Sequence, residues 1–254
     1  MSSAVMRFEY PFNERVRTLL RLESLLDRIH LLAQQSDSRM HQIAMSSLFE
    51  LLDITDRADI KSAISQDLMR QRQTIAGYAD HPTASVQAIE ETVQSIDKAL
   101  EALNNLGRIG QIIRDNDWLV AIRGRLSIAG AAAQIDSPSL LAWQHRSEVR
   151  RRADLNQWLL SIEPLRRAIQ LTLLLLRQSG ESALALAPAG SYQRSLEGKS
   201  FHILQVWVDQ AESVYPEMSG NKHMMWVRFS RLDENLKIHS VNQEVNFKYA
   251  LCGL

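Results

Sequence analysis

The sequence predicts an α+β protein: a helical-bundle domain and a smaller antiparallel β domain that includes an N-terminal strand. From residue 13 to about residue 178, apolar residues recur every three or four positions, as they do along amphipathic helices. After Gly180 the pattern changes to alternating aromatic or β-branched and polar residues, which is typical of half-buried strands. A run of helices next to a run of strands indicates segregated layers.

The length of 254 residues allows one large domain or two unequal ones. We place the boundaries where the periodicity changes. The prediction is a helical domain over residues 13–180 and a β-rich domain made from residues 1–12 and 181–254.

The first helix begins after Asn13, whose side chain suits an N-cap. Its apolar residues from Val16 to Ala33 follow a helical period. Steps of four and seven residues place Arg17, Arg21 and Arg28 in one stripe on the opposite face. One face therefore packs and the other is cationic.

Cap residues and breaks such as His81-Pro82 delimit further helices. They are expected at residues 38–55, 59–79, 85–105, 108–114, 118–126, 137–145 and 163–180. In the third of these, apolar residues alternate three and four apart from Val86 to Leu103, close to a heptad seam. Such a seam needs a partner helix, in the same subunit or in another.

Strands are expected at residues 5–10, 201–208, 224–232 and 241–249. Turns at Gly220-Asn221 and Asp233-Glu234-Asn235 separate the later ones. The strand at residues 5–10 would join the N-terminus to the C-terminal sheet.

The composition predicts no net charge that would attract the protein to nucleic acid or to an anionic membrane, because 29 acidic residues balance 29 basic ones. Cys252 is the only cysteine, so an internal disulfide and a Cys-rich zinc site are excluded, and a reducing cytosol fits. Residues 1–7 lack the apolar segment of a signal peptide, and the longest apolar stretch is about half a membrane span. We expect a soluble, cytoplasmic protein with no membrane insertion.

Local charge is uneven. Residues 105–152 carry eight arginines against four acids, a balance of +4, whereas residues 80–104 carry five acids against Lys98, a balance of −4. Arginine pairs carboxylates or phosphates bidentately, so the first segment suits an anionic partner. The alternative is that these arginines coat helices and pair with neighbouring acids, each pair contributing about 0–1 kcal/mol. That alternative is favoured for Arg150, Arg151 and Arg152, which point around a helix, and is left open for Arg123 and Arg125.

Catalytic signatures are missing. The seven histidines lack metal-ligand spacing, and there is no P-loop, G-x-S-x-G or cysteine nucleophile motif, so we expect no enzyme activity, no cofactor and no metal. Gly107-Arg108-Ile109-Gly110 matches the GxxG of KH domains, but helical flanks favour a helix end and a turn. His145 could add a hydrogen bond or a charge beside the arginines. The five tryptophans are interpreted as core.

Several short, unusual motifs are spread along the chain. They are Phe8-Glu9-Tyr10-Pro11-Phe12-Asn13-Glu14 with Arg17 and Arg21, Glu50-Leu51-Leu52-Asp53, Arg108-Ile109-Gly110-Gln111, Arg123-Gly124-Arg125-Leu126-Ser127-Ile128, and Tyr215-Pro216 with Ser219-Gly220-Asn221-Lys222. In order and spacing the chain resembles the ZapD family from about Phe8 to Phe229. It departs from the family pattern at residues 129–136, where relatives tend to carry Gly, Cys and Phe.

The resemblance implies a non-enzymatic division factor at mid-cell that binds the acidic C-terminal tail of FtsZ and bundles its filaments, promoting Z-ring assembly. Carried over residue by residue, it implies tail-binding roles for Arg17, Arg21, Arg57, Arg114, Arg123, Arg125, His145 and Lys222. Bundling needs two sites, so a homodimer is expected. Two alternatives stay open: a nucleic-acid-binding protein using the same Arg cluster, and an enzyme acting on a phosphorylated metabolite.

Overall fold

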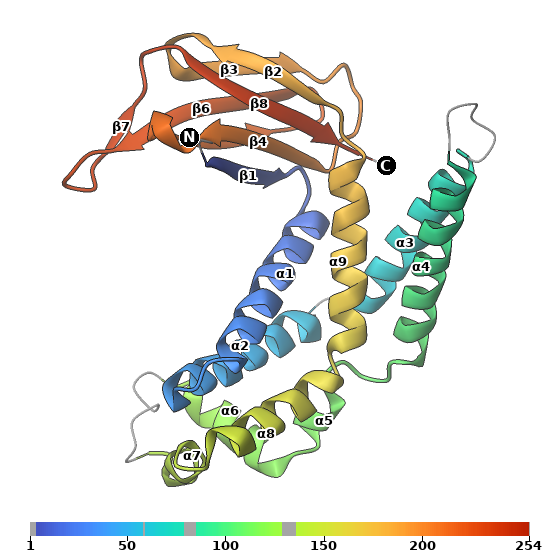
Figure 1. Ribbon diagram of the computed structural model, residues 1–254, viewed down its shortest axis with the longest axis vertical. Coiled ribbons are helices and arrows are strands. Elements are labelled where there is room, and N and C mark those ends of the chain that lie inside the picture. The colour runs from blue at the N-terminus through green and yellow to red at the C-terminus, as the bar shows by residue number, and fades with distance from the viewer. Residues whose placement is uncertain (1–3, 58, 79–84, 129–135, 254) are drawn as a thin grey trace. The chain divides into compact units, whose positions relative to one another are not determined.

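The computed structural model of the chain describes residues 4–57, 59–78, 85–128 and 136–253. Helices and antiparallel strands occupy separate parts of this chain, so the predicted α+β class is confirmed (Figure 1). Contacts group the residues into two compact units. One contains residues 1–19 and 173–254, and the other contains residues 20–172. We call them the β unit and the helical unit.

Nine helices lie in the described ranges. They are α1 (Glu14–Ala33), α2 (Ser38–Arg57), α3 (Ile60–Ala76), α4 (Val86–Asn105), α5 (Gln111–Arg114), α6 (Asp117–Leu126), α7 (Pro138–Gln144), α8 (Glu148–Leu160) and α9 (Glu163–Gln178). The Asn13 cap is confirmed, because its Oδ1 accepts from the Val16 N–H at 2.9 Å. The predicted break at His81-Pro82 and the loop 129–135 lie outside the described residues.

The predicted seam on α4 finds its partner within the same chain. Helices α3 and α4 run side by side as a hairpin (Figure 1). Ile96 and Leu103 of α4 are fully buried, as are Ile64 and Leu68 of α3. Val86, at the start of the seam, stays 53% exposed. The heptad-like spacing is therefore used mainly for packing inside the helical unit.

The β unit consists of two four-stranded antiparallel sheets. The first has the order β1 (Val5–Pro11), β4 (Ile203–Asp209), β8 (Val245–Cys252), β2 (Ser182–Ala187). The second has β3 (Ser191–Ser195), β6 (Met224–Leu232) and β5 (Tyr215–Gly220) in order, with β7 (Ile238–Ser240) paired to β6. The core contains Val206, Val227, Phe229 and Phe247, which come from both sheets. The predicted N-terminal strand is confirmed by its pairing with β4.

The strand prediction was wrong at several boundaries and incomplete elsewhere. The last strand begins at Val245 rather than Val241, although Val241 is buried and donates its N–H to the Phe229 carbonyl at 3.0 Å. Strands β2, β3, β5 and β7 had not been predicted. Strand β2 is built from Ser, Ala and Leu, and β5 contains Pro216, so neither has the β-branched alternation on which the prediction relied.

A partly buried ion pair fastens the end of α9 to β1 within the β unit. Arg177 bonds both carboxylate oxygens of Glu9, at 2.8 and 2.7 Å, and Gln205 donates to the same carboxylate at 2.9 Å. Burial would raise the pKa of Glu9, but these bonds outweigh it and hold the pKa below its usual value. Cys252 lies buried beside this network, and burial, with the nearby charge of Glu9 adding to it, raises its thiol pKa to about 11.

Candidate functional site

Two acidic residues near the end of α2 gather arginines from the following helices. Arg114 of α5 binds both oxygens of Asp56, at 3.1 and 2.9 Å, and also donates to the Ile109 carbonyl. Arg123 of α6 bonds Asp53 and reaches Asp56 at 3.4 Å. The bonds from Arg114 are the largest cause that holds the pKa of Asp56 below its usual value. Burial would lower the pKa of Arg123, yet its two acidic partners raise it.

This network decides how the cationic segment is interpreted. The balance of +4 over residues 105–152 does not include Asp53 and Asp56, which come from α2 and neutralise Arg114 and Arg123. Arg108 also lies 3.6 Å from Asp56. A nucleic-acid surface needs unpaired cations facing phosphates. The internal pairing therefore removes Arg114 and Arg123 from any surface that would face phosphates.

A pocket of about 450 Å³ opens beside Arg123. It lies between α2 and α6 and is lined by Ser46, Phe49, Glu50, Asp53, Val120, Arg123, Gly124, Leu126 and Ser127. Glu50 is bound by Arg28 of α1 at 2.5 Å, so the stripe on α1 reaches the residues that line the pocket. Arg57 stands one turn beyond Asp53 on the same face of α2.

Several predicted site residues in the helical unit are exposed and unpaired. Within the ranges that the structure covers, no ion pair is formed by Arg21, Arg57 or Arg125, and all three are exposed. His145 is exposed as well, as the C-cap of α7. Arg114 differs, because its side chain is only 11% exposed and its donors are occupied. Its geometry is that of a residue that positions Asp56.

Arg17 and Lys222 belong to the β unit. Arg17 bonds Glu14 at 2.8 Å, and its guanidinium lies 5.9 Å from the centre of the Tyr10 ring. The Tyr10 hydroxyl contacts the backbone of Gly220, at the start of the turn that carries exposed Lys222. Tyr10 therefore lies next to Arg17 and also next to the turn that carries Lys222.

The three consecutive arginines of α8 behave mostly as expected for structural residues. Arg151 is buried, bonds the Gln144, Arg146 and Ser36 carbonyls, and donates to Nδ1 of His41. Arg152 bonds Glu148 at 2.9 Å. Arg150 alone is exposed without an ion pair to any residue that the structure describes.

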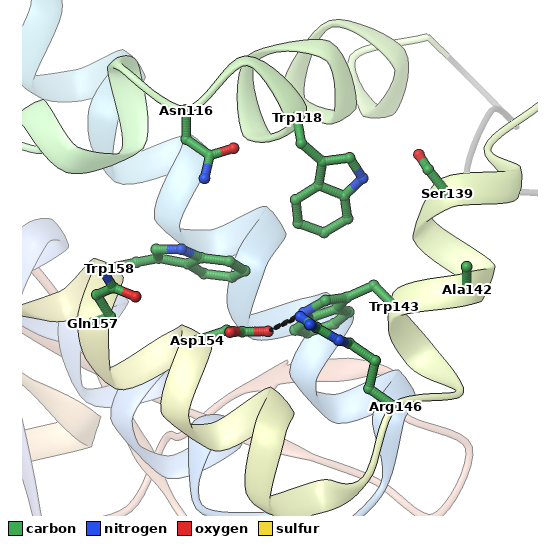
Figure 2. A pocket seen from close by; sticks show the side chains of 9 residues that line it. All are labelled: Asn116, Trp118, Ser139, Ala142, Trp143, Arg146, Asp154, Gln157 and Trp158. Carbon is green, nitrogen blue, oxygen red and sulfur yellow. Dashed lines mark hydrogen bonds and ion pairs between the residues drawn. The ribbon is translucent and has the colours of Figure 1, made fainter.

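A second pocket, of about 370 Å³, was missed by the sequence reasoning (Figure 2). Trp118, Trp143 and Trp158 line it, with ring centres 5.9–6.1 Å apart. Figure 2 shows the Trp118 ring above those of Trp158 and Trp143, with Ser139 and Ala142 on the right of the view. The helical periodicity of the sequence does not predict this pocket, because its three tryptophan rings come from three different helices, α6, α7 and α8.

The interpretation of all five tryptophans as core was wrong for some of them. Trp143 and Trp158 are 5% exposed, which agrees with it. Trp118 and Trp207 are only half-buried, and Trp226 on β6 is 38% exposed. Alternation along β6 turns Trp226 away from the core that Met225 and Val227 enter.

In the described ranges, no three side chains of His, Cys, Asp or Glu are grouped as metal ligands would be. None of the helices in those ranges has the length and apolar character needed to cross a membrane.

Comparison with known proteins gives the class of the protein. A family model described as "ZapD: Cell division protein" matches residues 20–228. The cell division protein ZapD of Bordetella pertussis is 47% identical over 251 residues, which cover 99% of each chain. The ZapD proteins of Janthinobacterium sp. and Cupriavidus necator are 41% and 40% identical over 97% of this chain and 98% of theirs. The chain therefore belongs to the ZapD family of cell division proteins.

Proposed function

We propose that this cell division protein is a cytoplasmic, non-enzymatic factor recruited to mid-cell, where it binds the C-terminal tail of FtsZ and cross-links FtsZ protofilaments into the Z-ring. The name of its relatives supports a role in division. The tail-binding role rests on the unpaired cations. The observation that carries it is Arg57, which is exposed without an ion pair in the described residues and follows by one helical turn Asp53, a residue that lines the pocket between α2 and α6.

An acidic tail suits these side chains for an energetic reason. Each charge-assisted hydrogen bond contributes about 1.5–3 kcal/mol, so a few of them offset the cost of ordering a flexible peptide. Arg21, Arg57, Arg125 and Lys222 have no acidic partner among the described residues to give up first. Arg123 and Arg17 share their guanidinium groups with acids, and we include them with His145 as secondary contacts.

The test is co-sedimentation with polymerised FtsZ, using full-length FtsZ and FtsZ without its C-terminal tail. We expect the protein to pellet with the first and to stay in the supernatant with the second. Equal pelleting with both would contradict the tail as the binding determinant. A control with duplex DNA at the same ionic strength should give no comparable binding.

A further inference from the structure

The tryptophan pocket takes no part in the cationic sites proposed above. Two of its rings, Trp143 and Trp158, are stacked at 29°, and Trp118 is tilted by about 40° to both. Its volume of about 370 Å³ falls at the lower end of the range for ligand sites, roughly 300–1,000 Å³. It is thus large enough for one or two side chains.

The pocket has a fixed wall and a polar rim. Trp143 Nε1 donates to Asp154 Oδ2 at 2.8 Å, and Arg146 Nη1 donates to the same oxygen at 2.9 Å (Figure 2). These bonds hold the Trp143 ring in place and neutralise the carboxylate. Ser139, Asn116 and Gln157 add hydroxyl and amide groups that lie around the indoles in Figure 2.

The lining chemistry selects among ligands. A cation would gain from the exposed indole surface, which belongs mainly to Trp118 because Trp143 and Trp158 are 5% exposed, but it would meet the Arg146 guanidinium, and the one acid in the lining is already paired. An inorganic anion would lie against the indoles without an unpaired cation in the lining. An uncharged apolar side chain buries its surface against the rings, while amides at the rim can bond the backbone on either side of it.

Charge at the edge of the pocket favours an acidic segment around that side chain. Arg150 lies one helical turn before Asp154 on α8 and is exposed without an ion pair in the described residues. Arg146 binds Asp154 through Nη1 and is half-exposed, so the rest of its fork can still donate.

We propose that the pocket formed by Trp118, Trp143 and Trp158 holds an apolar anchor side chain of an acidic, extended peptide, with Arg146 and Arg150 binding a flanking carboxylate. This inference rests on the proposed function, since the peptide is the FtsZ tail. It adds an apolar subsite to a recognition that charge alone would leave unspecific.

The experiment measures binding of a fluorescent peptide of the FtsZ C-terminal tail by anisotropy. Ala142 is exposed and lines the pocket, so Ala142→Trp fills the space without touching the core. Ala153→Trp is the matched control, because Ala153 is exposed on α8 and does not line the pocket. We expect A142W to weaken binding about 10-fold or more, as loss of a buried anchor does, and A153W to bind like the wild type. Trp118→Ala should weaken binding to a similar extent, with its fold checked by circular dichroism.

A second peptide, with its apolar residues replaced by serine and its acidic residues kept, separates the contribution of the apolar anchor from that of the charges. We expect it to bind the wild type weakly and to be insensitive to A142W. If the tail peptide binds the wild type and A142W equally well, the anchor subsite is wrong while the proposed function stands. If the wild type does not bind the tail peptide at all, the proposed function fails and the subsite fails with it.

Discussion

At the scale of single residues, the buried pair of His41 and Arg151 ties separate loops together. His41 is fully buried; Nε2 donates to the Gln35 carbonyl at 2.6 Å, and Nδ1 accepts from Arg151 Nε at 3.1 Å. These two bonds require the neutral imidazole, because a protonated ring has no acceptor nitrogen. Burial is the largest cause that lowers the His41 pKa, and the charges of Arg151 and Arg152 add to it; the hydrogen bond to the Gln35 carbonyl and, to a smaller extent, the charge of Glu148 oppose it without reversing the direction.

The first prediction concerns pH and stability. Below the unfolded pKa of 6.5 the unfolded chain binds a proton at His41 that the folded chain, with its lower pKa, does not bind. Stability from neutral His41 is thus fully present above pH 6.5 and is lost as the pH falls toward the folded pKa. His41→Phe should lower the free energy of unfolding by about 1–3 kcal/mol at pH 8, because it removes the hydrogen-bond partners of Arg151 Nε and of the Gln35 carbonyl. Urea titrations at pH 8 and pH 5 should give a smaller gap at pH 5; an unchanged gap would contradict a buried neutral histidine.

The second prediction separates binding from folding on α1. Arg21 is exposed without an ion pair in the described residues, whereas Arg17 bonds Glu14 and lies over Tyr10. Arg21→Glu should therefore abolish co-sedimentation with FtsZ and leave the melting temperature unchanged. Arg70→Glu is the matched control, since Arg70 is also exposed and without an ion pair there, on α3. Equal binding by both variants would remove Arg21 from the site.

At the scale of elements, the sequence motifs that resemble the ZapD family contact one another. In the helical unit, Leu52 packs against Gly110, and Asp53 binds Arg123. In the β unit, the Tyr10 hydroxyl and the Phe12 ring both lie against Gly220. Motifs that are far apart along the chain thus contact each other in the fold, which gives a physical reason for their unusual composition.

The third prediction tests one such contact. Gly110 has φ +68° and precedes α5, and a Cβ there would overlap the Leu52 side chain. Gly110→Ala should cost about 2–4 kcal/mol of unfolding free energy, from left-handed backbone strain together with overpacking. Gly107→Ala is the control, because no atom lies within 4 Å of a Cβ at that position. Chemical denaturation should find G107A within about 0.5 kcal/mol of the wild type; a similar value for G110A would contradict the close packing.

Elements that depend on local signals were predictable from the sequence. The Asn13 cap, the amphipathic period of α1 and the turn at Gly107–Gly110 all follow from a few neighbouring residues. The short strands β2 and β5 were not, because pairing with β8 and β6 rather than strand propensity makes them.

The candidate site was only partly predictable, for a related reason. A charge count over residues 105–152 does not include acidic residues from other segments that fold against them. It therefore missed Asp53 and Asp56 of α2, which pair with Arg114 and Arg123. The indole pocket combines three helices whose packing no local period encodes. Trp143 and Trp158 are buried, as predicted for core residues, but no pattern in the sequence predicts a pocket beside them.

At the scale of the whole molecule, bundling poses a requirement that one tail-binding pocket does not meet. A single pocket can decorate a filament, whereas cross-linking needs at least two pockets held together. A two-fold homodimer is the commonest way to supply them. The α4 seam packs against α3 with Ile96 and Leu103 fully buried, whereas Ile89, Val93 and Leu100 are only partly buried and Val86 is exposed. Because the buried part of the seam is not available to a second copy, we propose a dimer whose contact lies mainly outside this seam.

The last prediction concerns assembly and avidity. Light scattering should report a particle of twice 28.9 kDa at micromolar concentration. Once one pocket is bound, the second acts at an effective concentration in the millimolar range, which raises avidity about 100-fold or more without new contacts. Val86→Glu should leave the dimer intact, because the seam mainly packs within the chain. A variant that scatters as a monomer should still bind the tail peptide in anisotropy and lose FtsZ bundling in turbidity and electron microscopy. Wild-type bundling by a strict monomer would contradict this mechanism and require two pockets on one chain.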